Sequence, residues 1–123
     1  MSLALLIVDD NRAFLEAARN LLEREGLSVV GVASTIDEAL RQADQLRPDV
    51  ALVDISLAEE SGFELARRLC EHPPGGGPPV ILISTHAEAD FADLIADSPA
   101  AGFLAKSQLS AEAIRGILNG RSQ

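Results

Sequence analysis

Aromatic and basic side chains are scarce in this sequence of 123 residues, which has no tryptophan, no tyrosine and a single lysine, Lys106. The two missing aromatic types are the usual stacking partners of nucleobases and flavins. With 19 acidic against 10 basic residues, the formal net charge is −9. Because phosphate contacts require clusters of lysine and arginine, we do not expect this chain by itself to bind nucleic acid or an anionic membrane.

Cysteine and long apolar runs are scarce as well. Cys70 is the only cysteine, so no internal disulfide can form, which is typical of a reducing compartment. No apolar run approaches the roughly 20 residues that span a bilayer, and the N-terminus lacks the basic segment and cleavage site of a signal peptide. These absences predict a cytoplasmic protein that does not associate with a membrane.

The apolar content of 47% is enough for one hydrophobic core. The length predicts a single domain over residues 1–123, and both ends are compatible with excision from a longer protein. Residues 73–79 are all proline or glycine, which predicts a surface connection inside that domain.

Strand-like apolar runs alternate with helical patterns along the chain. Five short runs predict strands at residues 3–8, 28–33, 50–53, 80–83 and 101–104. Helical spacing and capping residues predict helices over residues 11–25 and 87–96, and others that begin at Thr35, Ser61 and Ser110. Five βα units with right-handed crossovers predict an α/β fold, a flavodoxin-like doubly wound sandwich with the parallel strand order 2-1-3-4-5.

Local patterns set finer expectations for three helices. Thr35 with Glu38, and Ser61 with Glu64, have the spacing of capping boxes. Gly120 is expected just past the end of the last helix. The buried face of the second helix is expected to consist of Ala39, Leu40, Ala43 and Leu46.

Polar side chains follow four of the five predicted strands. In chain order they are an acid pair, a single acid, a hydroxyl pair and one ammonium: Asp9 and Asp10, Asp54, Ser84 and Thr85, and Lys106. The carboxyl ends of parallel strands share one edge of the sheet, and ligands of open α/β sheets bind at that edge. We therefore expect these groups to converge on one site.

The converging groups have the chemistry of a magnesium-assisted site that accepts a phosphoryl group. Carboxylates packed together repel one another unless a cation compensates, and Mg²⁺ prefers hard oxygen ligands. A metal ion and a lysine ammonium would both offset the charge of an incoming phosphoryl group. Asp54 is the natural nucleophile, because attack by a carboxylate yields an aspartyl phosphate.

Each group also has an ordinary structural explanation. Asp9 and Asp10 could cap the first helix and complement its dipole. Ser84 or Thr85 could satisfy backbone groups at the end of a strand, and Phe103 could simply belong to the core. Found together at one edge of the sheet, the acids and the lysine favour a functional site.

With these residues in these places, the chain resembles a response-regulator receiver domain of two-component signalling over essentially its whole length. Asp9 and Asp10 match the acid pair of that family, and Asp54 matches its phosphoacceptor. Ser84 matches the switch hydroxyl, Phe103 the switch aromatic and Lys106 the lysine. Three positions differ from the commoner residues of the family: Ser84 replaces threonine, Phe103 replaces tyrosine and Ser107 replaces proline.

The resemblance implies a metal ion and a phosphoryl donor. Mg²⁺ would be bound by Asp10, Asp54 and the backbone carbonyl of Ser56, with Asp9 acting through water. The phosphoryl group would come from a histidine kinase or a phosphotransfer protein. The chain would be a signalling switch rather than an enzyme, promoting only its own aspartyl phosphorylation and dephosphorylation.

The resemblance also implies a response to phosphorylation. Charge on Asp54 would draw Ser84 and Lys106 inward, and Phe103 would fill the vacated space. A change of shape would then follow in the surface made by the helix at 87–96, the strand at 101–104 and the last helix. That surface would bind a partner or form a homodimer. The segments around Asp54 and Lys106 resemble receivers that often precede a helix-turn-helix DNA-binding domain, so a stand-alone receiver and a truncated transcription factor both stay open.

Three alternative functions remain for comparison. A degenerate receiver would keep the site but bind proteins independently of phosphorylation. A phosphatase of the haloacid-dehalogenase kind would need a second aspartate two residues after the nucleophile, where this chain has Ser56. A flavodoxin-like FMN binder would need a hydroxyl- and glycine-rich loop after the first strand, where this chain has Asp9 and Asp10.

Overall fold

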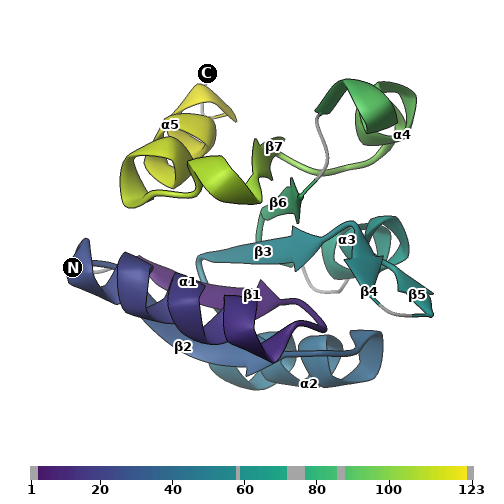
Figure 1. The fold of residues 1–123 in the computed structure, drawn as a ribbon. Coiled ribbons are helices and arrows are strands. Elements are labelled where there is room, and N and C mark those ends of the chain that lie inside the picture. Colours follow the sequence, from purple (N-terminus) through teal and green to yellow (C-terminus); the bar gives the residue numbers. More distant parts are fainter. Residues whose placement is uncertain (1–2, 58, 72–76, 86–87, 122–123) are drawn as a thin grey trace.

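The computed structural model describes residues 3–57, 59–71, 77–85 and 88–121 (Figure 1). Part of the predicted proline- and glycine-rich connection, residues 73–76, lies outside the described residues. The described helices include none that is both long and apolar enough to cross a bilayer.

A five-stranded parallel sheet forms the middle layer. Its strands, in chain order, are β1 (Ala4–Val8), β2 (Ser28–Ala33), β3 (Val50–Asp54), β6 (Val80–Ser84) and β7 (Gly102–Ala105). Their order across the sheet is β2-β1-β3-β6-β7, and every pairing is parallel. This confirms the predicted doubly wound α/β fold and its strand order.

Helices cover both faces of this sheet. The helices are α1 (Arg12–Arg24), α2 (Ile36–Leu46), α3 (Gly62–Cys70), α4 (Ala92–Asp97) and α5 (Ala111–Arg121), with short 3₁₀ turns η1 (Glu88–Phe91) and η2 (Lys106–Gln108). Apolar residues of α1 and α5 pack on one face, and those of α2 and α3 pack on the other. The sheet therefore separates two hydrophobic clusters, as the three-layer sandwich requires.

The central strands are apolar throughout because both of their faces are buried. In β1, Leu5 and Ile7 face the cluster with α1 and α5, whereas Leu6 and Val8 face the cluster with α2 and α3. All four side chains are fully buried. Alternation between two covered faces explains why these strands read as continuous apolar runs.

Several helix starts follow the predicted capping. The Thr35 hydroxyl accepts a hydrogen bond from the Glu38 N–H, and the Ser110 hydroxyl accepts one from the Ala113 N–H. At α1 the cap is Asn11 rather than Asp9 or Asp10, and its side chain accepts from the Phe14 N–H. These bonds satisfy backbone donors that the first turn of a helix leaves unpaired.

Other local expectations were wrong. Ser61 caps α3 as predicted, its hydroxyl accepting from the Phe63 N–H, but the carboxylate of Glu64 pairs with Arg67 instead of completing the second capping box. Leu46 is exposed at 43%, although it was assigned to the buried face of α2. Gly120 lies inside α5, which continues to Arg121. Arg67 draws Glu64 away from the start of α3, whereas Leu46 and Gly120 lie at the ends of their helices, where the local pattern decides less.

A two-stranded hairpin after β3 was not predicted from the sequence. It consists of β4 (Ser56–Leu57) and β5 (Glu60–Ser61), which pair antiparallel. Its strands are too short to show a periodic pattern. The hairpin begins at Ser56, two residues after the end of β3. It brings Glu60 to the N-terminus of α2, where the Glu60 carboxylate accepts from the Ile36 N–H at 3.0 Å.

Candidate functional site

The register of the sheet brings the strand-end residues together. Val8 of β1 lies opposite Val53 of β3, so the next residues along, Asp9 and Asp54, are neighbours. Asp54 lies opposite Ile83 of β6, and one residue further on Ser84 lies opposite Ala105 of β7. The residue after Ala105 is Lys106, so four chain segments end at one edge.

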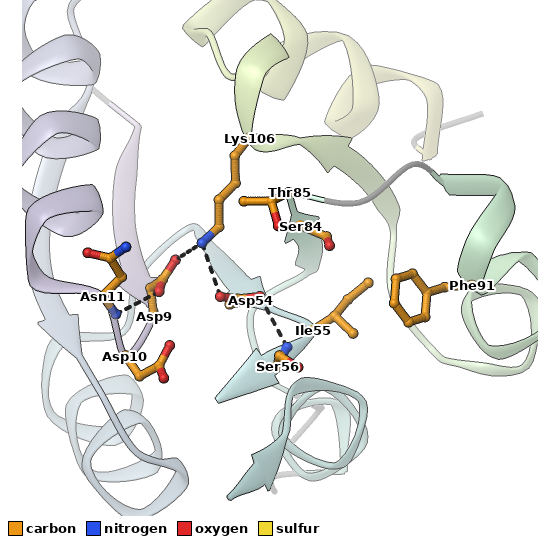
Figure 2. Close-up of a pocket in the computed structure, with 10 residues that line it drawn as sticks. All are labelled: Asp9, Asp10, Asn11, Asp54, Ile55, Ser56, Ser84, Thr85, Phe91 and Lys106. Carbon is orange, nitrogen blue, oxygen red and sulfur yellow. Dashed lines mark hydrogen bonds and ion pairs between the residues drawn. The ribbon is translucent and has the colours of Figure 1, made fainter. Parts of the chain in front are cut away.

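Lys106 reaches back from the end of β7 to two carboxylates (Figure 2). Its ammonium lies 2.5 Å from Asp9 Oδ2 and 3.1 Å from Asp54 Oδ2. Asp9 Oδ2 is buried and has no other polar partner among the described residues, so the ammonium is what compensates its charge. The one lysine of the chain therefore links the acid after β1 to the acid that ends β3.

Burial and charge act against each other at this ion pair. Burial raises the pKa of Asp9 above its ordinary value, and the nearby charge of Asp54 adds to the rise, while Lys106 and the Asn11 N–H lower the pKa by less. For Lys106, burial disfavours the charged form, but Asp9 and Asp54 together outweigh burial and raise its pKa. The ammonium is thus held in its charged form by the two carboxylates.

The three acids differ in exposure and in contacts. Asp9 is fully buried, and its Oδ1 accepts a hydrogen bond from the Asn11 N–H at 2.8 Å. Asp54 is 8% exposed, and its Oδ1 accepts from the Ser56 N–H at 3.1 Å. Asp10 is exposed and borders the same cavity. Asp9 and Asp54 are therefore oriented by backbone donors from their own loops.

Gly62 lets α3 begin directly beneath Asp54. Its N–H donates to the carbonyl of Ile55 at 2.8 Å. A Cβ at this position would collide with the backbone carbonyl of Asp54. The absence of a side chain at Gly62 is thus needed for the loop that carries Asp54 to turn into α3.

A cavity of about 360 Å³ opens over these residues. The side chains and backbone that surround it belong to Asp9, Asp10, Asn11, Asp54, Ile55, Ser56, Ser84, Thr85, Phe91 and Lys106 (Figure 2). Asn11, Ile55 and Phe91 were not among the predicted site residues. The capping position of Asn11 could have suggested it, whereas Phe91 reaches the cavity from η1 without a recognisable sequence pattern.

The two predicted switch residues lie at different places. Ser84 is 4% exposed at the end of β6 and borders the cavity. Phe103 lies half-buried on the edge strand β7 and packs against the cluster that contains α2 and α3. Phe103 is absent from the residues that surround the cavity, where Phe91 supplies the aromatic ring.

The acid cluster has the donor set for a divalent cation. Carboxylate oxygens of Asp9, Asp10 and Asp54 all lie within 4.8 Å of one another. These are hard oxygen donors, which Mg²⁺ and Ca²⁺ prefer. The residues present therefore fit a metal ion.

Comparison with known proteins places this arrangement in a family. Residues 5–118 match the model of the response regulator receiver domain. The chain belongs to this family. The receiver domain is a module of two-component signalling, and its match spans every strand of the sheet and all four strand-end segments.

Curated relatives of this receiver domain include response regulators and a putative transcriptional regulator. The response regulator GacA of Pseudomonas viridiflava is 32% identical over 113 residues, which are 91% of this chain and 52% of the relative. A putative transcriptional regulator of Pseudomonas aeruginosa is 35% identical over 103 residues, which are 84% of this chain and 49% of the relative. The receiver domain thus spans about half the length of these curated relatives.

Solved receiver structures superpose closely on this chain. A two-component response regulator of the LuxR family from Aurantimonas sp. has a TM-score of 0.85 and 26% identity, covering 98% of this chain and 87% of that one. A response regulator from Burkholderia pseudomallei, solved with a phosphorylated aspartic acid and a calcium ion, has a TM-score of 0.78 and 29% identity, covering 95% of this chain and 66% of that one. The fold of this receiver domain is therefore one that supports aspartyl phosphorylation in a relative.

Proposed function

We propose that this receiver domain accepts a phosphoryl group on Asp54 from a phosphohistidine of a histidine kinase or a phosphotransfer protein. The observation that carries the proposal is the surroundings of Asp54. Its carboxylate borders an open cavity, with an ammonium 3.1 Å from one oxygen and two further acids beside it. A carboxylate so placed is accessible to a phosphoryl donor and has a cation at hand for the added charge.

The proposed reaction is an in-line transfer. One oxygen of the Asp54 carboxylate attacks the phosphorus, and the bond from phosphorus to the donor imidazole nitrogen breaks as the new bond to oxygen forms. The electron pair of the broken bond stays on the imidazole, which takes up a proton from solvent. The product is an aspartyl phosphate, a mixed anhydride that water can later hydrolyse at phosphorus.

Lys106 and Asp9 prepare the site for that charge. The ammonium of Lys106 already contacts Asp54, so a small rotation would bring it to an equatorial oxygen of the phosphoryl group. Asp9 anchors the same ammonium from the opposite side, which keeps the flexible lysine side chain at the cavity. Ser84, buried at the end of β6, supplies a hydroxyl for another phosphoryl oxygen.

Asp10, Asp54 and the backbone carbonyl of Ser56 would hold Mg²⁺, with Asp9 acting through a water molecule. When bound, the ion would neutralise charge on the carboxylates and on the phosphoryl oxygens. The close approach of the three carboxylates supports this assignment, as does the calcium ion in the phosphorylated Burkholderia relative.

The proposed output is a change in the surface made by α4, β7 and α5. Movement of Ser84 and Lys106 toward the phosphoryl group would pull on the ends of β6 and β7, and Phe103 of β7 would follow. That surface would bind a partner or a second copy of the chain. Since curated relatives include transcription regulators about twice as long, we propose a cytoplasmic regulator whose DNA contacts are made outside this domain.

Intact mass after incubation with acetyl phosphate tests the proposal. We expect one added phosphoryl group in the presence of Mg²⁺, none with EDTA and none in Asp54→Asn. Treatment with hydroxylamine should remove the group, because it cleaves acyl phosphates. A folded protein that gains no mass with Mg²⁺ would refute phosphoacceptor activity and favour a degenerate receiver that binds its partners constitutively.

A further inference from the structure

The ammonium of Lys106 has a third neighbour besides the two carboxylates. The ring of Phe14, in the first turn of α1, lies beneath it with 4.3 Å between Lys106 Nζ and the ring centroid. This distance is well inside the range in which an aromatic face attracts a cation. The lysine side chain is 12% exposed, so the ring acts on a charge that is largely withdrawn from water.

The start of α1 fixes where this ring lies. The Asn11 side chain caps the helix by accepting from the Phe14 N–H at 3.2 Å, and the Asn11 N–H donates to Asp9 Oδ1. The Phe14 side chain is half-buried and packs against the cluster between the sheet and α5. One turn of helix therefore ties the ring to the same acid that holds Lys106.

A ring differs from the carboxylates in how it responds to phosphorylation. The ion pairs of Lys106 with Asp9 and Asp54 must rearrange when a phosphoryl group competes for the ammonium. The attraction of a neutral ring for the ammonium does not depend on the charge of Asp54, and the ring adds no negative charge that would repel a phosphoryl oxygen. Phe14 can thus stay in contact while the ionic partners exchange.

We propose that Phe14 is a positioning residue for Lys106. By cation–π attraction, the Phe14 ring keeps the ammonium at the cavity while the ammonium exchanges its carboxylate contact for a phosphoryl oxygen. The proposal rests on the proposed function, in which Lys106 contacts the phosphoryl group. Phe14 acts through the lysine and does not itself touch the reacting atoms.

The single lysine makes the contact directly observable. Protein labelled with ¹³Cε-lysine gives the signal of one side chain, and the ring current of Phe14 should shift the attached protons upfield. We expect Phe14→Leu to remove this upfield shift and Phe14→Tyr to retain it. An unchanged Lys106 signal in Phe14→Leu would overturn the contact, whether or not the protein can be phosphorylated.

The rate of phosphorylation by acetyl phosphate tests the positioning role. We expect Phe14→Leu to slow the reaction about threefold to tenfold, as for loss of one partly desolvated cation–π contact, and Phe14→Tyr to react like the wild type. In a Lys106→Met background, Phe14→Leu should have no further effect. A Phe14→Leu rate equal to the wild-type rate, or an equal slowing in both backgrounds, would overturn the positioning role.

The two measurements separate the possible failures. If wild-type protein gains no phosphoryl group, the proposed function fails and the positioning role fails with it, while the lysine signal still reports on the contact. If wild-type protein is phosphorylated but Phe14→Leu reacts at the wild-type rate, the positioning role alone is refuted. The melting temperatures of Phe14→Leu and Phe14→Tyr verify that both variants are folded.

Discussion

At the scale of residues, two adjacent acids have different surroundings. Asp9 is fully buried against Lys106, whereas Asp10 is exposed at the rim of the cavity. An acid pair in a sequence does not reveal which member is buried, because that depends on the direction in which the chain leaves β1. The buried carboxylate of Asp9 depends on the Lys106 ammonium as its counter-ion.

The Lys106 ion pairs predict a loss of stability at alkaline pH. The raised pKa of Lys106 means that the folded protein holds this proton more tightly than the unfolded chain, so its contribution is complete below about pH 10.5 and is lost as the pH rises through the folded pKa. Lys106→Gln should cost about 2 kcal/mol of unfolding free energy at neutral pH, because Asp9 loses its cation.

Denaturant unfolding of both proteins in EDTA, from neutral to alkaline pH, measures this effect. The stability difference between wild type and Lys106→Gln should stay constant to about pH 10.5 and then shrink. The chain has no tyrosine and no other lysine, and Cys70 is present in both proteins. A difference that remains constant through this range would contradict the stabilising role of the ion pairs.

At the scale of elements, the loop between β3 and α3 determines the shape of the site. It contains the hairpin β4–β5, contributes the Ser56 N–H to Asp54, and turns into α3 at Gly62. Glu60 fastens the hairpin to α2 through the Ile36 N–H. Contacts to β3, α3 and α2 therefore hold the segment that follows Asp54.

Two glycines that sit in helices should respond oppositely to alanine. Gly62→Ala should destabilise the protein by about 2–4 kcal/mol, because the new Cβ collides with backbone that cannot move without displacing Asp54. Gly116→Ala should stabilise it by about 0.5–1 kcal/mol, because α5 gains helix propensity and the Cβ meets open space. Urea denaturation measures both, and an equal effect of the two substitutions would contradict the close approach at Gly62.

The contact between Glu60 of the hairpin and α2 should also contribute measurably to the unfolding free energy. Glu60→Ala should lower the unfolding free energy by about 1 kcal/mol, because the Ile36 N–H at the start of α2 loses its charged acceptor. Glu60→Gln keeps an oxygen acceptor and should retain part of that stability. Glu59→Ala, at the exposed neighbouring carboxylate, is the matched control, and an equal loss in that variant would argue against the capping contact.

At the scale of the whole molecule, excess negative charge accumulates where the strands end. The chain has a net charge of −9, and the site has three carboxylates but one lysine, which pairs with Asp9 and Asp54. A divalent cation that binds only the folded state should therefore stabilise the entire domain. The melting temperature of the domain should thus report on metal binding at the site.

Magnesium should raise the melting temperature in a saturable way. At a concentration about 100 times the dissociation constant, the expected gain is about 2.7 kcal/mol. Asp10→Asn should raise the melting temperature of the metal-free protein by about 2–5 °C, because it relieves carboxylate repulsion, and should reduce the gain from Mg²⁺.

Sodium chloride at matched ionic strength separates binding at the site from general screening of the net charge. Equal stabilisation by the two salts, or an Asp10→Asn variant that responds to Mg²⁺ like the wild type, would contradict a metal site at this cluster.

The apolar runs by themselves determined the strands, because a strand covered on both faces must be apolar throughout. The parallel order followed from the alternation of strands and helices, and the convergence of Asp9, Asp54 and Lys106 followed from that order. These features depend on periodicity and handedness, which are local properties of the chain. For this reason the layers, the strand order and the edge that carries the site could be predicted.

Tertiary packing decided the features that join residues far apart in the sequence. Four such features have no periodic pattern of their own: the exposure of Leu46, the hairpin after Asp54, the contact of Glu60 with α2 and the ring of Phe14 beneath Lys106. Each depends on the angle at which one element meets another, to within about an ångström, and no local rule sets that angle. The sequence determined that the acids and the lysine reach the site, and the packing of α1 and the hairpin decided how they are held there.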